Sequence, residues 1–428
     1  MKKKLIFFAH SNNDIDHYLP IIMENKVYEI LIFFSPDGNT LDINLLHKKI
    51  LSEKNIQIFK IENFIKNPII KLIYLVYKKI KFLKIYVKKT NIFSKVINKL
   101  IIVTDKIIKN LISKNELSQF FINLFKNKNI NLIVIDIQTQ NYNDHSNLFR
   151  KSLDIFLSTG KKMNIPLFMI SHGVNIVFHD QKKGIPDRTN KFQSDSLALC
   201  NKFETFLYKN LAKKKNYIKN LGDVRFDMSW INYLKKINYK KIKDLNEKNN
   251  KLKILYVLGN LPFLDSDIEH SINKEIVNLL HDFKDAEMWV KIHPRTNKNF
   301  DFKHKNLKIF YQDVDTSILI QASDVVITTL SGVLTEAILS KKLAILHDGW
   351  KKYLQNSWTI FDDTNCVKKV KNYHQLKKEI NLYSKNNLTS YQERDDYYRK
   401  FISGGKSISE SLTRNYLIEI DNLLKRFN

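Results

Sequence analysis

The sequence predicts an α/β protein built from two Rossmann-like domains that face each other across a cleft. Short apolar runs rich in Ile, Leu, Val and Phe alternate with longer helix-like segments, and this alternation occurs in two series. Continuous apolar strands separated by helices are typical of parallel sheets covered on both faces. At 428 residues the chain is too long for one compact core and suits two domains of ordinary size.

Each series supplies the strands of one domain. The first contains runs at 5–10, 28–34, 56–61, 131–136 and 166–173, and the second contains runs at 253–259, 286–295, 307–313, 323–329 and 343–349. Between them, residues 235–251 are rich in Lys and Asn and lack apolar periodicity, which indicates a linker. We therefore expect an N-terminal domain over 1–240 and a C-terminal domain, with a final helix, over 252–428.

One segment, residues 64–111, interrupts the first series with twelve lysines and a single acid, Asp105. Its apolar residues repeat at helical spacing, and they are Ile69, Ile73, Val76, Ile80, Leu83 and Val87. This spacing predicts a basic amphipathic helix. Two interpretations stay open: a helix whose apolar stripe packs on the sheet, and an interfacial helix that docks on anionic lipid.

The formal net charge of +28 favours anionic partners such as nucleotide phosphates, nucleic acid or an acidic membrane surface. Part of this excess follows from a general bias towards Lys, Asn and Ile. The two cysteines, Cys200 and Cys366, have neither disulfide-framework nor zinc-site spacing. The N-terminal apolar run is too short for a signal peptide, and no long apolar stretch predicts a spanning helix. We expect a cytoplasmic protein.

The most informative motif, TTLSG, follows the strand at 323–329. Thr328 and Thr329 end the strand, and Ser331 and Gly332 lead into a helix whose free N–H groups form an anion site. Glu336, one turn into the helix, could reach the ribose of a nucleotide bound there. Alternatively, the serine caps the helix and the glutamate is a first-turn acid favoured by the helix dipole.

A second motif, KIHPR, supplies cations beside the first. The strand at 286–295 delivers Lys291, His293 and Arg295 to its carboxyl end, and Pro294 stops further pairing. Two fixed cations and one titratable ring are suited to neutralising a diphosphate. We therefore predict a donor-phosphate site formed by these residues and the TTLSG turn.

The first half offers two candidates after its own strands. His172 follows a buried strand, and Gly173 permits a tight turn, so the imidazole is a candidate general base for an acceptor hydroxyl or a structural turn histidine. Further on, Arg225 either forms a local ion pair with Asp227 or reaches the donor phosphates.

Several other chemistries lack support. His10, Asp14, Asp16 and His17 have a spacing that matches no metal site. The sequence contains no GxGxxG, P-loop, HExxH or GxSxG motif. We expect no metal and no cofactor beyond a nucleotide-activated substrate.

Taken as a series, these residues resemble the B-type, two-Rossmann glycosyltransferases, and within them the superfamily of CDP-glycerol glycerophosphotransferases, bacterial polysialyltransferases and capsule Kdo transferases. The matching pieces are His172-Gly173, Gly222 with Arg225 and Asp227, His293-Pro294, the turn from Thr328 to Gly332, and Gly404-Gly405-Lys406 before a C-terminal helix. The resemblance implies that His172 and His293 are catalytic, the latter at the donor phosphate. It also implies that the Ser/Thr turn binds phosphate and that no metal is essential.

The resemblance implies transfer of a glycosyl or glycerophosphoryl group from a nucleotide-activated donor to a hydroxyl of a surface-polysaccharide, capsule or teichoic-acid-like acceptor, which is a saccharide or is linked to lipid. The usual Trp-His-Gly is Ser171-His172-Gly173 here, and the usual Pro-Arg-Asn-Asp is Val224-Arg225-Phe226-Asp227. A sugar nucleotide of unspecified kind is therefore expected. The protein would be cytoplasmic, with a peripheral position on the inner face of the cell membrane as the alternative location.

Two other functions remain as alternatives. A non-hydrolysing UDP-N-acetylglucosamine 2-epimerase shares the fold and the Ser-Gly…Glu turn, although its Gly-Thr-Arg-Pro-Glu segment is AHSNN at 9–13 here. A non-enzymatic basic protein that binds nucleic acid fits the charge, but no stacking aromatics are interleaved with the basic residues as in RNA-binding modules. We expect no specific nucleic-acid partner.

Overall fold

The chain forms two compact units in the computed structural model. The model describes residues 2–35, 43–63, 65, 67–86, 92–137, 148–178, 193–246, 251–259, 266–293, 304–311, 314–329, 331–347, 358–383 and 389–427. The first unit comprises Met1–Gly173, Pro186–Arg225 and Ser411–Asn428, and the second comprises Val174–Ile185 and Phe226–Glu410. Each unit has a parallel central sheet with helices, so the predicted fold class of two Rossmann-like α/β domains is confirmed.

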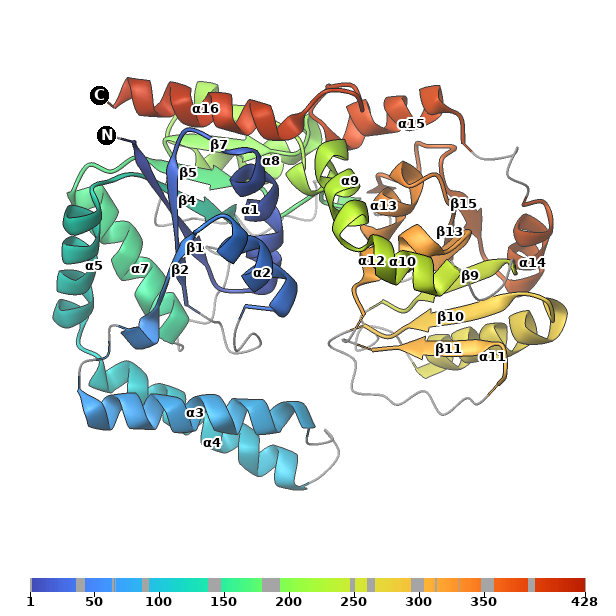
Figure 1. Ribbon diagram of the computed structural model, residues 1–428, viewed down its shortest axis with the longest axis horizontal. Coiled ribbons are helices and arrows are strands. Elements are labelled where there is room, and N and C mark those ends of the chain that lie inside the picture. The colour runs from blue at the N-terminus through green and yellow to red at the C-terminus, as the bar shows by residue number, and fades with distance from the viewer. Residues whose placement is uncertain are drawn as a thin grey trace. The chain divides into compact units, whose positions relative to one another are not determined.

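Seven parallel strands form the sheet of the first unit, in the order β3-β2-β1-β4-β5-β7-β8 (Figure 1). They are β1 (Lys4–Ala9), β2 (Glu29–Phe34), β3 (Gln57–Lys60), β4 (Ile130–Asp136), β5 (Leu167–Ile170), β7 (Ser196–Leu199) and β8 (Ile218–Asn220). The strand order reverses between β1 and β4. In doubly wound sheets such a switch point opens a crevice at the carboxyl ends of the strands.

An aromatic core joins this sheet to its helices. The helices of the first unit are α1 (Asn12–Glu24), α2 (Leu45–Glu53), α3 (Pro68–Tyr86), α4 (Ile92–Leu111), α5 (Lys114–Lys128), α7 (Leu148–Lys162), α8 (Thr205–Tyr208) and α16 (Leu412–Arg426). Phe156 of α7 packs against Phe33 of β2 with ring centroids 5.9 Å apart, and edge-on against Phe121 of α5 at 5.1 Å. Buried aromatic contacts of this kind hold helices firmly on a sheet.

The second unit repeats the plan with six parallel strands in the order β11-β10-β9-β12-β13-β15. They are β9 (Lys253–Val257), β10 (Glu287–Lys291), β11 (Leu307–Phe310), β12 (Val325–Thr328), β13 (Leu343–His347) and β15 (Lys368–Val370), and a separate antiparallel pair joins β6 (Val177–Phe178) to β14 (Trp358–Thr359). The helices are α9 (Met228–Ile237), α10 (Tyr239–Asn246), α11 (Ser266–Asp282), α12 (Thr316–Ala322), α13 (Val333–Leu339), α14 (Tyr373–Asn381) and α15 (Tyr391–Tyr397).

All ten expected strands are present, each within a few residues of its expected bounds. The sequence did not indicate β7, β8 or β15, which lie towards the edge of their sheets and are short. Two of them carry polar residues: β8 reads IKN and β15 reads KKV. An edge strand is covered less completely than a central one, so its apolar signal is weak.

The limits of the units differ from the expected domain boundaries. The expected linker at 235–251 is largely helix, since α9 and α10 extend through it to Asn246. Lysines occupy the exposed side of α10, and a single buried residue, Ile242, anchors it. Both helices belong to the second unit, whereas the C-terminal helix α16 belongs to the first.

The expected single helix in residues 64–111 is in fact two helices, α3 and α4, which pack on each other. The expected stripe on α3 is also wrong in part: Ile73 is partly buried, but Ile69 and Val76 are exposed. The side that packs carries Tyr74 and Tyr77 instead, while Val87 lies outside the described residues. Apolar residues occur around most of this helix, so periodicity alone does not identify the packed face.

Candidate active site

The carboxyl ends of β1, β4 and β5 lie side by side because these three strands are neighbours in the sheet. β1 leads into His10 and the start of α1, β4 ends at Asp136, and β5 leads into Ser171 and His172. Asp136 is level with Ile170 at the end of β5. The topology therefore collects polar groups from three distant parts of the sequence at the switch point of the sheet.

The start of α1 is fixed by a reciprocal capping box. The side chain of Ser11 accepts a hydrogen bond from the backbone N–H of Asp14, and the Asp14 carboxylate accepts one from the backbone N–H of Ser11. The same carboxylate lies 2.5 Å from Nδ1 of His10. With the first turn held in this way, Asn13 and His17, four residues apart, project from the same face of the helix.

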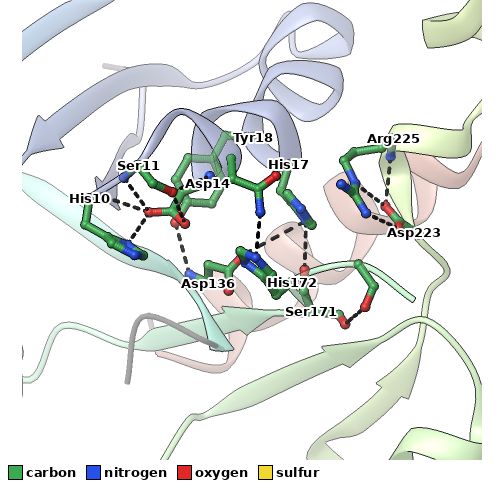
Figure 2. A network of polar contacts seen from close by, with 12 residues as sticks. His10, Ser11, Asp14, His17, Tyr18, Asp136, Ser171, His172, Asp223 and Arg225 are labelled. Carbon is green, nitrogen blue, oxygen red and sulfur yellow. Dashed lines mark hydrogen bonds and ion pairs between the residues drawn. The ribbon is translucent and has the colours of Figure 1, made fainter. Parts of the chain in front are cut away.

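A buried carboxylate orients the imidazole of His172. Oδ2 of Asp136, which is fully buried, lies 2.9 Å from Nδ1 of His172 (Figure 2). Nδ2 of Asn13 lies 2.6 Å from Nε2 on the other side of the ring. A carboxylate can only accept, so Nδ1 carries a proton, and in the neutral ring this leaves the lone pair on Nε2, beside the Asn13 amide. That is the form that a general base requires.

A second imidazole, that of His17, stacks on the first with ring centroids 5.0 Å apart and planes inclined by 16°. Its Nδ1 lies 3.1 Å from the carbonyl oxygen of Ser171, to which it donates. Its buried Nε2 has no hydrogen-bond partner among the described residues. Burial, the charge of Arg225 and the charge of His172 lower the pKa of His17 well below its ordinary value. His17 therefore stays neutral.

The pKa of His172 moves the other way. Burial acts to lower it, but the charge of Asp136 and its hydrogen bond outweigh burial and raise the pKa above its ordinary value. Two stacked histidines thus differ in their readiness to take a proton. Pairs of titratable groups with pKa values pushed apart are a common sign of acid–base function.

His17, Asp136 and His172 also form a cluster whose ligand atoms lie within 4.8 Å of one another. Two imidazoles and one carboxylate are a donor set used by divalent transition metals. Arg225, however, places a positive charge close enough to affect the pKa of both rings. A charge of that sign opposes the binding of a cation.

The four polar residues at the start of the chain do not act as one group. Besides the His10–Asp14 pair and the stacked His17, Asp16 pairs with His47 of α2, with Oδ1 2.6 Å from Nε2. The structure therefore divides them among three different contacts.

Gly173 follows the candidate base, and its surroundings exclude a side chain. Its φ is +96°, and a Cβ atom there would lie 2.1 Å from Nη2 of Arg225. The guanidinium is held by Asp223, at 3.0 Å, and not by Asp227, whose pairing with Arg225 was one of the two alternatives that the sequence left open. Asp227 instead caps α9 by accepting from the backbone N–H of Ser229.

The candidate donor residues lie at strand ends in the second unit. Lys291 of β10 and Thr328 of β12 are both level with Val257 of the strand between them. Both side chains bond within the sheet: Nζ of the lysine donates to the carbonyl oxygen of Tyr311, and the threonine hydroxyl donates to that of Val257 at 2.8 Å. These two residues are therefore engaged in holding strands together.

The other candidate donor residues lie beyond the strand ends. His293 is partly exposed, two residues after β10. Ser331 accepts from the backbone N–H of Val333 at 3.3 Å, and Gly332 is the N-cap of α13 without a side-chain cap bond. The carboxylate of Glu336 accepts from the hydroxyl of Ser317. The buried Thr329 follows β12 directly, and Arg295 lies outside the described residues.

Of the residues proposed from the sequence, His172 and Arg225 lie in the first unit and the others in the second. The sequence did not identify Asp136 or Asn13 as partners of the candidate base, and it gave no role to His17. Asp136 had one visible signal, since it is the only charged residue of its expected strand and occupies the carboxyl end.

Solved structures share this fold over nearly the whole chain. The UDP-GlcNAc 2-epimerase from Neisseria meningitidis bound to UDP-GlcNAc is similar with a TM-score of 0.56 and 10% identity, covering 99% of this chain and 100% of that one. The UDP-GlcNAc 2-epimerase from Methanocaldococcus jannaschii is similar with a TM-score of 0.55 and 12% identity, covering 98% of this chain and 99% of that one. The wall teichoic acid polymerase TagF soaked with CDPG is similar with a TM-score of 0.54 and 14% identity, covering 100% of this chain and 90% of that one.

At these identities the likeness shows a common fold, of the GT-B type. No protein-family model matches the sequence. Neither does any curated protein.

Replacing Asp136 by Asn removes the negative charge beside His172, so the pKa of His172 should fall. We expect the ring to titrate above about 6.5 in the wild type, the ordinary histidine value, and lower in Asp136→Asn. Histidine ring signals followed by NMR as a function of pH measure this directly. Asp16→Asn, which removes the carboxylate paired with His47, is the control. An unchanged His172 pKa in Asp136→Asn would contradict the assignment.

Gly173→Ala should destabilise the protein more than Gly405→Ala. Both glycines have positive φ, but a Cβ atom at Gly405 meets nothing within 4 Å, whereas at Gly173 it displaces Arg225. Backbone strain of this kind costs about 1–3 kcal/mol at each site. Thermal and urea denaturation compare the two variants, and equal losses would show that the guanidinium does not constrain Gly173.

Proposed function

We propose that this protein is a transferase that moves a glycosyl or glycerophosphoryl group from a nucleotide-activated donor to a hydroxyl of a surface-polysaccharide, capsule or teichoic-acid-like acceptor. One observation carries the proposal: a buried carboxylate, Asp136, orients His172 so that Nε2 presents a lone pair at the switch point of a doubly wound sheet. The same proposal places the protein in the cytoplasm, peripherally on the inner face of the cell membrane.

In the proposed reaction His172 is the general base. The acceptor hydroxyl displaces the amide of Asn13 at Nε2 and gives its proton to the ring as its oxygen attacks the donor group. Asp136 stabilises the imidazolium that forms, just as it raises the pKa of the ring in the free protein. His17, which stacks on this ring, stays neutral and therefore adds no positive charge beside the imidazolium.

The second unit is proposed to bind the donor. The bond between the transferred group and the nucleotide phosphate breaks, and its electron pair leaves with the phosphate. His293, Arg295 and the backbone N–H groups around Ser331 and Gly332 would stabilise that charge, a task that fixed donors perform well. Lys291, Thr328 and Thr329 would hold the strand ends that carry these groups, and Glu336 would contact the ribose.

We propose that these fixed charges and hydrogen bonds act without an essential metal. Arg225 has a structural part in this scheme, since it supports the turn at Gly173 through its pair with Asp223. Likeness to the TagF polymerase soaked with CDPG and to an epimerase bound to UDP-GlcNAc supports a nucleotide-activated donor.

A UDP-N-acetylglucosamine 2-epimerase is the second candidate. It is favoured by the likeness to epimerases over almost the full length of both chains. A histidine held by a carboxylate can also remove a proton from carbon. The two reactions differ in one respect that is simple to test, because an epimerase needs no acceptor.

A ligand screen should identify the donor class and separate the two candidates. We expect one of CMP, CDP, UDP and GDP to raise the melting temperature, because the product nucleotide binds only the folded donor site. The matching activated donor should then release nucleotide only when an acceptor is added. If UDP-N-acetylglucosamine alone is converted to its 2-epimer, the protein is an epimerase.

His172→Ala should lower kcat by about 10²–10⁴-fold, the usual contribution of a general base, while the nucleotide-induced shift in melting temperature is kept. His293→Ala should also lower turnover, with the fold intact. His281→Ala, at an exposed histidine of α11, is the matched control and should leave kcat unchanged. A fully active His172→Ala variant would refute the proposed mechanism.

A further inference from the structure

We propose that the helical pair α3–α4 is a docking surface for an anionic phospholipid bilayer, with α4 lying in the plane of the interface. The two helices run side by side in the first unit (Figure 1). The surface centres on one exposed row of apolar side chains on α4, Val96, Leu100, Val103, Ile107 and Leu111, here called the α4 stripe.

α4 has two apolar faces, and within the described part of the chain one of them packs against the protein while the other stays exposed. Ile97 and Ile108 are buried, and Ile101 is partly buried against the core that includes Tyr74 and Tyr77 of α3. These residues, together with contacts of α4 with α3 and α7, attach the helix to the unit. The helix therefore already has the apolar face that it needs for folding.

The α4 stripe is a second face that the fold does not use. Its members are spaced by four, three, four and four residues, which aligns them along one side of a helix. Their exposed fractions are 44–55%. On α3, the residues Ile69, Leu72, Leu75 and Val76 are exposed as well. A group of exposed apolar side chains of this size marks an interaction surface in a folded protein.

The charges beside the stripe identify the partner. Lys99 and Lys106 are exposed on α4, at positions that border the stripe along its length, and Lys71 and Lys79 are exposed on α3. The sequence of α3 contains no acidic residue and that of α4 contains one. Apolar residues bordered by lysines suit a bilayer with anionic headgroups, in which the stripe enters the acyl boundary and the ammonium groups meet phosphates.

A second copy of the chain fits this surface poorly, since two copies would bring lysines against lysines. Spanning the bilayer is also not indicated. Among the helices of the described part of the chain, none combines the length and the hydropathy that crossing a membrane requires.

Vesicle co-sedimentation of the full chain tests the proposal. We expect binding to vesicles of phosphatidylcholine with phosphatidylglycerol, weaker binding to phosphatidylcholine alone, and loss of binding as salt is raised. The double variant Val103→Glu/Ile107→Glu should lower the partition constant at least about tenfold, because it places charge in the apolar interface. Lys99→Glu/Lys106→Glu should lower it by roughly fivefold or more for each lysine.

Matched controls change the same chemistry elsewhere. Ile418→Glu alters an exposed apolar residue of α16, and Lys240→Glu/Lys241→Glu alters exposed lysines of α10, so both should bind vesicles as the wild type does. Circular dichroism establishes that every variant is folded. Wild-type chain that fails to bind anionic vesicles, or a stripe variant that binds them unchanged, overturns the proposal. So does a wild-type dimer that Val103→Glu/Ile107→Glu makes monomeric, which would identify the stripe as a self-association surface.

Discussion

A buried carboxylate cannot remain charged without partners, and this constraint organises the first unit around Asp136. Its side chain bonds to His172, and its backbone N–H donates to the hydroxyl of Tyr18, which in turn donates to the carbonyl oxygen of Phe8. One short network therefore ties β1, α1, β4 and the loop after β5 together. The groups that orient the candidate base are the same groups that hold the sheet and its first helix in register, so the site and the core are built from one set of contacts.

The fold could be predicted from the sequence to a large extent, because central parallel strands are buried on both faces and read as continuous apolar runs. The candidate site could be predicted only where a residue follows such a run directly, as His172 does. Its partners are separated from it by 36 residues, for Asp136, and by 159 residues, for Asn13. Linear spacing could not place His17 either, since its neighbours come from the loop after β5 and not from its own helix, α1.

The same limit explains why the side-chain contacts of the candidate donor residues could not be predicted. Lys291 and Thr328 lie at strand ends, as expected, but sequence alone does not tell whether a side chain at a strand end points outwards or bonds to the adjacent strand.

In residues 64–111 the helical spacing of the apolar residues was visible in the sequence. Apolar residues lie on more than one face of these helices, however, so the spacing did not identify the face that packs. Packing decides between them, and packing is a property of the whole unit.

The C-terminal helix has a consequence for synthesis of the chain. α16 belongs to the first unit, where Glu419 accepts a buried hydrogen bond from Ser196 at 2.7 Å and Tyr416 donates to the carbonyl oxygen of Gly222 at 2.7 Å. On the ribosome, the second unit, an insertion within the first, can complete its sheet before residues 411–428 emerge. The first unit, with its candidate base, is completed only when residues 411–428 have also been made, so it finishes folding after the second unit, although its chain begins first.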